Sequence, residues 1–188
     1  MDMKNKIFIL SVGIFSLVLF VATATYSLLV WTTAGVNTSI NFEVEGLTIN
    51  YTNGNNLTAT LTPSTAKLAD NNIEIEFWNG GSTTLNGSLV LTPTALPEVL
   101  KSSALKWELY KSSSVSNSVP TYPSSPIASG NFAELTQGTA ATLYTSTLPT
   151  TATYYKLYIW LDKSLITYAM NNSTLSVTLS ANAVDVRS

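Results

Sequence analysis

The chain has 188 residues, of which 11% are charged, and it carries a formal net charge of −2. It contains neither Cys nor His, which excludes disulfides, thiolate chemistry, cysteine metal sites and every catalytic arrangement that depends on a histidine base. The low charge argues against nucleic acid as a partner, because neutralising phosphates requires clustered Lys and Arg. The many Ser, Thr and Asn residues suit exposed strand faces and turns, so the composition favours a surface or extracellular β-protein.

The N-terminus carries a short basic region followed by a long apolar run. Two lysines within the first six residues precede Ile7–Ala22, which has no charged residue, and a small-residue Ala-Thr-Ala pattern ends at Ala24. Together these features predict a secretory signal peptide over residues 1–24, cleaved after Ala24. The alternative is a retained membrane helix, because the apolar character continues to Trp31 and about 25 residues are enough to span a bilayer.

The segment that follows is apolar but differs in kind from the first run. Residues 25–33, TYSLLVWTT, are β-branched and aromatic and contain no helix-favouring Ala, Glu or Lys, which favours a strand. An extended segment of this sequence has apolar side chains on both faces, and such a strand cannot remain exposed on a soluble monomer. It needs either a membrane or the core of another subunit. The apolar side chains concerned are Tyr26, Leu28, Leu29, Val30 and Trp31.

Residues 41–188 alternate between short apolar–polar runs and turn sequences. A short helix is expected at 96–102, one or two helical turns at 164–170, a long Ser/Pro surface loop at 112–126 and a connector at 130–135. Regularly spaced short strands predict an all-β protein, an antiparallel β-sandwich or jelly roll with an N-terminal apolar segment. The predicted strands are 39–44, 47–52, 57–61, 73–78, 88–91, 105–110, 141–145, 154–162 and 174–184.

Carboxylates supply the candidate metal ligands. Glu43 and Glu45 share one face of a predicted strand, as Glu74 and Glu76 do, and Asp70 begins an Asp-Asn-Asn loop. Such oxygens can bind Ca²⁺ or serve acid–base chemistry, although alternation with apolar residues is also what a solvated strand face shows. We expect no catalytic residue, no cofactor and no enzyme activity, and we leave structural Ca²⁺ open as the one cofactor.

Two further patterns concern the surface. Tyr154, Tyr158 and Trp160 form an aromatic stripe on one face of the strongest predicted strand, where they can bind sugar or pack against other side chains. The N-x-[Ser/Thr] pattern marks candidate N-glycosylation sites, and in a chain rich in Asn, Ser and Thr it also arises by chance. It occurs at Asn37, Asn50, Asn56, Asn86, Asn171 and Asn172.

The order of these segments resembles a known family. The basic region MDMKNK is followed by an apolar segment ending in VATATYSLLVW, by FEVEGLTINY, and by a strand and turn reading NNIEIEFWNGGSTTLNGSLVL. This order resembles the TasA/camelysin family of secreted biofilm fibre proteins and the related archaeal bundling-pilus and thread subunits. Phe42, Gly46, Leu47 and Ile49 match, with looser spacing, the family's F-x-x-G-x-L stretch, and Phe77–Val90 matches its strand–turn–strand unit.

The resemblance covers roughly residues 1–91 and implies a mechanical function. It implies a jelly-roll subunit with an incomplete sheet, which the N-terminal segment of a neighbouring copy completes by donating a strand. Donor and acceptor are then different patches, so the contact need not close and a filament grows. On this reading residues 1–24 are the signal peptide, residues 25–40 the donor strand and residues 41–188 the sandwich domain of an extracellular pilus or biofilm-matrix fibre. The peptidase label that camelysin carries gains no support from a chain without His.

Two other functions fit the same residues. One is a membrane-anchored extracellular β-sandwich that retains residues 1–24 and contacts an S-layer or a surface filament. The other is a carbohydrate-binding module that uses Tyr158 and Trp160. All three readings place the chain at the cell surface, and they differ in its partners, which are other copies of itself, a membrane or a glycan.

Overall fold

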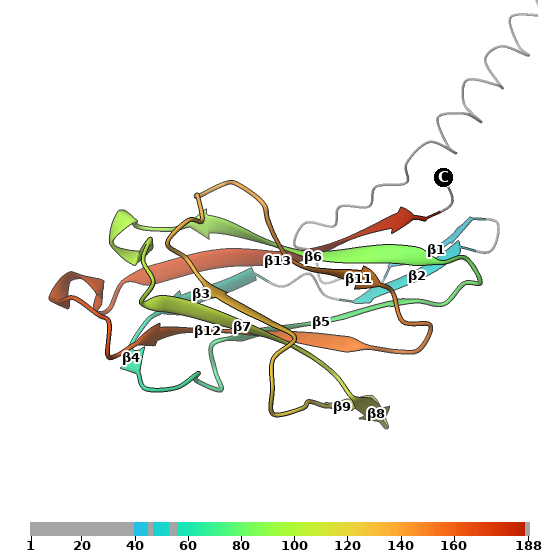
Figure 1. The fold of residues 1–188 in the computed structure, drawn as a ribbon, viewed down its shortest axis with the longest axis horizontal. Helices are drawn as coiled ribbons and strands as arrows, with labels where there is room; N and C mark the ends of the chain where they lie inside the picture. Colours follow the sequence, from blue (N-terminus) through green and yellow to red (C-terminus); the bar gives the residue numbers. More distant parts are fainter. Residues whose placement is uncertain (1–39, 45–46, 53–55, 187–188) are drawn as a thin grey trace, which may run out of the picture. The chain divides into compact units, whose positions relative to one another are not determined.

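The computed structural model describes residues 40–44, 47–52 and 56–186, and the side chains from residue 56 onward except that of Asp185 (Figure 1). The predicted signal peptide lies outside these residues, and so does the predicted donor strand apart from Ile40, which begins the first described strand. Within the described part no helix is long and apolar enough to cross a membrane.

The described part of the chain is built from strands, with two short 3-10 turns, as the alternating pattern predicts. The 3-10 turns are η1 (Glu98–Leu100) and η2 (Tyr168–Met170). The strands are β1 (Ile40–Val44), β2 (Leu47–Thr52), β3 (Asn56–Thr60), β4 (Pro63–Ser64), β5 (Asn72–Asn79), β6 (Leu85–Ala95), β7 (Leu105–Lys111), β8 (Ser114–Ser116), β9 (Val119–Thr121), β10 (Ala128–Asn131), β11 (Ala141–Thr147), β12 (Tyr154–Asp162) and β13 (Thr174–Asp185).

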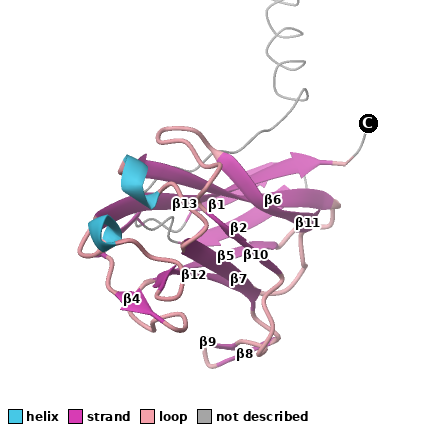
Figure 2. Ribbon diagram, turned by 60° about the vertical axis from the view of Figure 1, so that its left-hand side comes forward, coloured by secondary structure: helices cyan, strands magenta, loops and turns pink. Residues whose placement is uncertain are grey.

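The strands form an antiparallel β-sandwich with jelly-roll connectivity. One layer, sheet B, has the strand order β11-β6-β13-β3, and the other, sheet A, contains the order β5-β12-β7-β10. The β1–β2 hairpin extends sheet A beyond β5, and β4 pairs in parallel with the end of β12. Figures 1 and 2 show β6, β13 and β11 in one layer, β5, β7 and β12 in the other, and the β8–β9 hairpin projecting away from sheet B.

Alternate residues of each strand point into the space between the two sheets. In β5 the side chains of Ile73, Ile75 and Phe77 are buried, and the residues between them are partly exposed. The same period of two runs through the longer strands of both sheets, because successive side chains of a strand point to opposite faces. The core therefore lies between the sheets. Its strand residues include Leu89, Leu91, Leu105, Leu109, Tyr155, Leu157, Ile159, Leu175, Val177 and Leu179.

Packing in the core requires a glycine at position 87. Gly87 lies in β6 on its inward face, and a Cβ there would come within 2.2 Å of a Leu148 side-chain carbon and 2.7 Å of the Phe77 ring. No larger residue fits at that distance, so the Gly of the Asn-Gly-Ser sequence lets the loop after β11 close over the core.

The predicted loop at 112–126 is wrong in its first half. It contains the β8–β9 hairpin, whose two-residue turn has positive φ at Asn117 (49°) and at Ser118 (63°). Positive φ at both central positions defines the turn type whose twist matches that of a hairpin. The hairpin could not be recognised in this Ser- and Pro-rich sequence, because each of its strands is only three residues long.

Other local boundaries also differ from the predicted ones. The strand predicted at 88–91 extends over the eleven residues of β6, and the expected connector at 130–135 begins with part of β10. The helix expected at 96–102 is reduced to η1, one turn that Pro97 begins. Each difference arises where tertiary pairing, rather than local propensity, sets the length of the element.

Candidate assembly and recognition surfaces

The aromatic stripe predicted on β12 lies on the outer face of sheet A and is used within the fold. Trp160 is only 8% exposed, and Tyr158 is half-buried. The Tyr158 ring packs edge-on against Tyr110, with 5.7 Å between the ring centroids. Such edge-to-face pairs stabilise a sheet beyond the area they bury. The stripe therefore packs against other side chains of the same domain.

A lysine from the segment before β5 fastens that segment over the stripe. The Lys67 amine lies 3.0 Å from a Glu108 carboxylate oxygen, donates to the Tyr110 hydroxyl and sits 4.0 Å from the centre of the Tyr110 ring. The Tyr110 hydroxyl in turn donates to Glu108. This combination of ion pair and cation–π contact ties two segments that are distant in sequence, β7 and the segment before β5.

The β8–β9 region is fastened to the same face from the other side. The Tyr122 hydroxyl donates to Glu74 at 2.8 Å, and the Lys156 amine lies 4.8 Å from the centre of the Tyr122 ring. Lys156 also pairs with Glu74 at 2.7 Å across β5 and β12. Burial and the bond to Glu74 raise the pKa of Tyr122, so this hydroxyl keeps its proton and remains a donor.

Two carboxyl groups on this face have lowered pKa values. Burial opposes the charged form of Glu108, but hydrogen bonds from Tyr110 and Lys67 outweigh it and lower its pKa. The hydrogen bond from Lys106, with further bonds from Ser164, lowers the pKa of Asp162 to about 2. Both groups are therefore ionised at neutral pH, and their partners hold them in fixed places rather than poised for proton transfer.

The outer face of sheet B is built from different chemistry. Among the described residues, its outward positions carry mostly hydroxyl and amide side chains, with Val90 and Val184, and no charged residue, and neighbouring strands exchange hydrogen bonds between hydroxyl groups. Thr58 pairs with Ser176 at 2.9 Å, and Ser88 pairs with Thr145 at 2.9 Å. Such hydroxyl pairs are exposed to solvent, so each contributes little to the stability of the fold.

The described Asn-x-Ser/Thr sites gather on sheet B and at one end of it. Asn56 and Asn86 are exposed on its outer face, and each accepts a hydrogen bond through its side-chain oxygen, from Thr178 and Thr147 respectively. The side-chain nitrogen, to which a glycan would be attached, is the other atom of that amide. Asn171 and Asn172 are exposed between η2 and β13. Asn37 and the side chain of Asn50 lie outside the described residues.

Strand pairing at one edge of sheet B is uneven. Among the described residues, β3 pairs with β13 from Thr174 to Thr178, and β13 continues to Asp185 and pairs with β6 over that remaining length. The two strands before this edge belong to different sheets. β2 pairs with β5 in sheet A, and the next strand, β3, belongs to sheet B. We call residues 179–185 of β13 the extension segment.

The carboxylates proposed as metal ligands are not gathered in the described part of the chain. Within it no three Asp or Glu side chains lie close enough to hold an ion. Asp70 is exposed in the turn before β5. The side chain of Glu43, in β1, and all of Glu45 lie outside the description, so the Ca²⁺ prediction stays untested there.

Sequence reasoning found the outward aromatic residues but missed their partners. Lys67 lies in a segment without a predicted element, and Tyr122 lies in the predicted loop. The one available signal was the pairing of Glu74 with a lysine, Lys156, at the matching outward position of β12, and this requires the strand order.

Comparisons with known proteins add little to this description. No protein-family profile and no curated protein matches the chain. Among solved structures it is similar to that of the infectious bursal disease virus Gt strain, with a TM-score of 0.35 and 14% identity over 83% of this chain and 33% of that one. The chain thus spans about a third of that protein.

Two other solved structures are similar at the same level. One is the xylan-binding module CBM15, with a TM-score of 0.33 and 14% identity over 80% of this chain and 98% of that one. The other is a Xylanase10C mutant from Cellvibrio japonicus in complex with xylopentaose, with a TM-score of 0.28 and 11% identity over 84% of this chain and 23% of that one. At these TM-scores none of the three likenesses bears on function.

Proposed function

We propose that the chain is a structural subunit of an extracellular surface filament, a pilus or a biofilm-matrix fibre, in which each copy donates a strand to the next. The observation that carries the proposal is that Val184 and Val186, at the end of β13, are among the few large hydrophobic residues exposed in the described part of the chain. A strand donated by a neighbouring copy at this end of β13 would cover these apolar side chains.

The donor we propose is the apolar segment at residues 25–36. In extended form it presents apolar side chains to both sides, which suits a strand placed between a sheet's interior and a neighbouring subunit. Main-chain hydrogen bonds would supply affinity, and the alternate side chains would supply register. Because the donor segment and the acceptor edge are different patches, repetition of the contact generates an open filament.

Exposed apolar side chains near the acceptor support this placement. Large hydrophobic residues are seldom exposed in the described part of the chain, and two of the five that are exposed, Val184 and Val186, lie at the end of β13. A neighbouring subunit bound beside the extension segment would remove them from water. The resemblance of residues 1–91 to the TasA/camelysin family supports the same assembly.

The remaining surfaces support a structural role over a catalytic one. The ionised groups on sheet A are fixed in ion pairs with lysines, and the stripe that a glycan would need for stacking is packed under Lys67. We therefore propose that the protein is not an enzyme, that it works outside the cell, and that its main partners are copies of itself.

Deleting residues 25–36 tests the proposal. We expect the variant to be secreted and folded, with the circular dichroism of the parent, and to form no filaments in electron micrographs. The matched control replaces Thr32 and Thr33 by Ser, which keeps the length and the apolar residues and should leave filaments intact. Normal filaments from the deletion variant would refute strand donation by this segment.

A further inference from the structure

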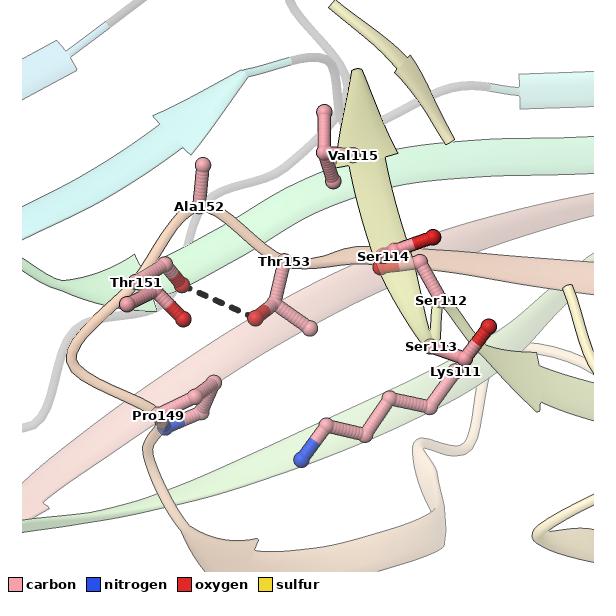
Figure 3. A pocket seen from close by; sticks show the side chains of 9 residues that line it. All are labelled: Lys111, Ser112, Ser113, Ser114, Val115, Pro149, Thr151, Ala152 and Thr153. Atoms are coloured by element: carbon pink, nitrogen blue, oxygen red, sulfur yellow. Dashed lines mark hydrogen bonds between the residues drawn. The ribbon is translucent and has the colours of Figure 1, made fainter. Parts of the chain in front are cut away.

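A polar pocket of about 390 Å³ opens at one end of the sandwich (Figure 3). Three segments form it: the end of β7, the start of the β8–β9 hairpin, and the connection between β11 and β12. Its volume lies in the range of small-ligand sites. Its lining consists of Lys111, Ser112, Ser113, Ser114, Val115, Pro149, Thr151, Ala152 and Thr153.

Lys111 is an unusual residue for its position. It is the last residue of β7 and continues the alternation of Leu105 and Leu109, whose side chains are fully buried between the sheets. It is half-buried, and it has no ion-pair partner among the described residues, whereas Lys67, Lys101, Lys106 and Lys156 each contact a carboxylate. A half-buried lysine without a carboxylate partner among the described residues favours an anionic ligand.

Hydroxyl groups make up most of the remaining lining, and several are held in place. The Thr153 hydroxyl donates to the Thr151 carbonyl oxygen at 2.8 Å, and the Ser112 hydroxyl accepts from the Tyr154 backbone N–H at 3.0 Å. Figure 3 shows the Thr151–Thr153 bond and the extended Lys111 side chain in the same pocket. Ser114 and Thr151 are exposed, with hydroxyl groups that reach the pocket.

The wall contributed by the hairpin is rigid. The Ser113 backbone N–H and hydroxyl both donate to the Thr121 carbonyl oxygen, at 2.9 Å and 3.2 Å. The Ser112 backbone N–H donates to the Tyr154 carbonyl oxygen at 2.8 Å, which ties the hairpin to β12. A pocket whose walls are fixed in advance loses little conformational freedom when a ligand enters.

We infer that this pocket binds an acidic sugar, with Lys111 on the carboxylate of a uronic-acid residue and the Ser and Thr hydroxyls on its ring hydroxyls. The lining has one cation and no acidic side chain, which selects for the carboxylate. The non-polar surfaces of Val115 and Pro149 fit the C–H face of a sugar ring. The inference does not depend on filament assembly, because no pocket residue lies in β3 or β13.

Equilibrium dialysis of the full-length protein against radiolabelled D-glucuronate tests the inference. We expect saturable binding, competed by unlabelled glucuronate and not by equal concentrations of D-glucose or sulfate. Lys111→Met, which keeps the side-chain length and removes the charge, should weaken binding about tenfold or more, since a hydrogen bond to a charged group is lost. Thr151→Ala, on an exposed residue whose backbone carbonyl is unchanged, should weaken it by a smaller factor.

The control variant is Lys163→Met. Lys163 is exposed in the turn after β12 and does not line the pocket, so this variant should bind glucuronate as the parent does. Equal competition by sulfate would mean a simple anion site and would overturn the sugar assignment. Absence of saturable binding, or equal losses in Lys111→Met and Lys163→Met, would overturn the site itself.

Discussion

The two outer faces of the sandwich are built from strands of similar length and alternation, yet they carry opposite chemistry. The face of sheet A holds lysines, carboxylates and aromatic rings that contact one another, and Trp160 on this face is only 8% exposed. The face of sheet B holds mostly uncharged hydroxyl and amide groups, some of which pair across strands at exposed positions. Alternation alone therefore says which side chains point outward, but not whether they stabilise the fold.

The contacts on the outer face of sheet A stabilise the fold, whereas the exposed residues of sheet B remain accessible to solvent. On sheet A, loops from 65–71 and 112–127 come over the strands and are fastened by Lys67 and Tyr122. On sheet B the exposed residues include Asn56 and Asn86, two of the candidate glycosylation sites. Sheet A's outer face therefore contributes contacts that hold the domain together, and sheet B's outer face carries two of the predicted glycosylation sites.

The largest effect should follow from truncating the buried aromatic residue on sheet A. Trp160→Ala removes a side chain that is 8% exposed, and we expect it to lower the free energy of unfolding by about 3–5 kcal/mol. Thr145→Ala, at an exposed outward position of sheet B, is the matched control and should change it by less than about 0.5 kcal/mol. Urea denaturation measures both, and equal losses would remove the distinction between the faces.

The next effect should come from the lysine that holds the 65–71 segment. Lys67→Met loses the contacts to Glu108 and to the Tyr110 ring, and we expect a loss of about 1–2 kcal/mol in the free energy of unfolding. The control is Lys101→Met, whose partner Glu98 is 84% exposed, and it should cost less than about 0.5 kcal/mol. If the Lys67 variant were as stable as the Lys101 variant, the charge of Lys67 would not be what holds the 65–71 segment in place.

A smaller effect concerns acid stability. The pKa of Asp162 is lowered in the folded protein from 3.8 to about 2, so its contribution is complete above about pH 4 and is lost as the pH falls toward 2. Asp162→Asn should remove that part of the pH dependence and leave the melting temperature between pH 4 and pH 2 flatter than in the parent. Thermal unfolding across this range measures it, and identical profiles for the two proteins would contradict the Lys106–Asp162 contribution.

The smallest effect should come from a hydroxyl pair on sheet B. Thr58→Ala breaks the bond to Ser176, but both partners remain in contact with water, so the free energy of unfolding should change by less than about 0.5 kcal/mol. Denaturation by urea again measures it. A loss comparable to that of Trp160→Ala would show that the hydroxyl pairs of sheet B hold the sandwich together.

The sequence predicts the sandwich where a strand's alternation is complete. Ile73, Ile75 and Phe77 against Glu74 and Glu76 identify both the strand and its buried face, and the structure confirms both. The β8–β9 hairpin could not be predicted in the same way, because three-residue strands rich in Ser show no period and their stability comes from tertiary contacts.

The candidate surfaces are less accessible to sequence reasoning than the fold. The aromatic residues of β12 are visible in the sequence, but whether they bind sugar or pack inside the domain depends on Lys67 and Tyr110, which lie far away in the chain. Likewise, the extension segment follows from the register of β3 against β13, and Lys111 becomes notable only once β7 has an inward face.

Disulfide trapping in assembled filaments tests strand donation most directly, because the chain has no Cys of its own. Val30→Cys would label the proposed donor and Val184→Cys the exposed end of β13, while Val30→Cys with Val119→Cys, on the β8–β9 hairpin, provides the control. Strand donation predicts that mild oxidation converts the first pair, and not the control pair, into a ladder of covalently linked subunits. Intact filaments that yield only single chains, or equal ladders from both pairs, would contradict it.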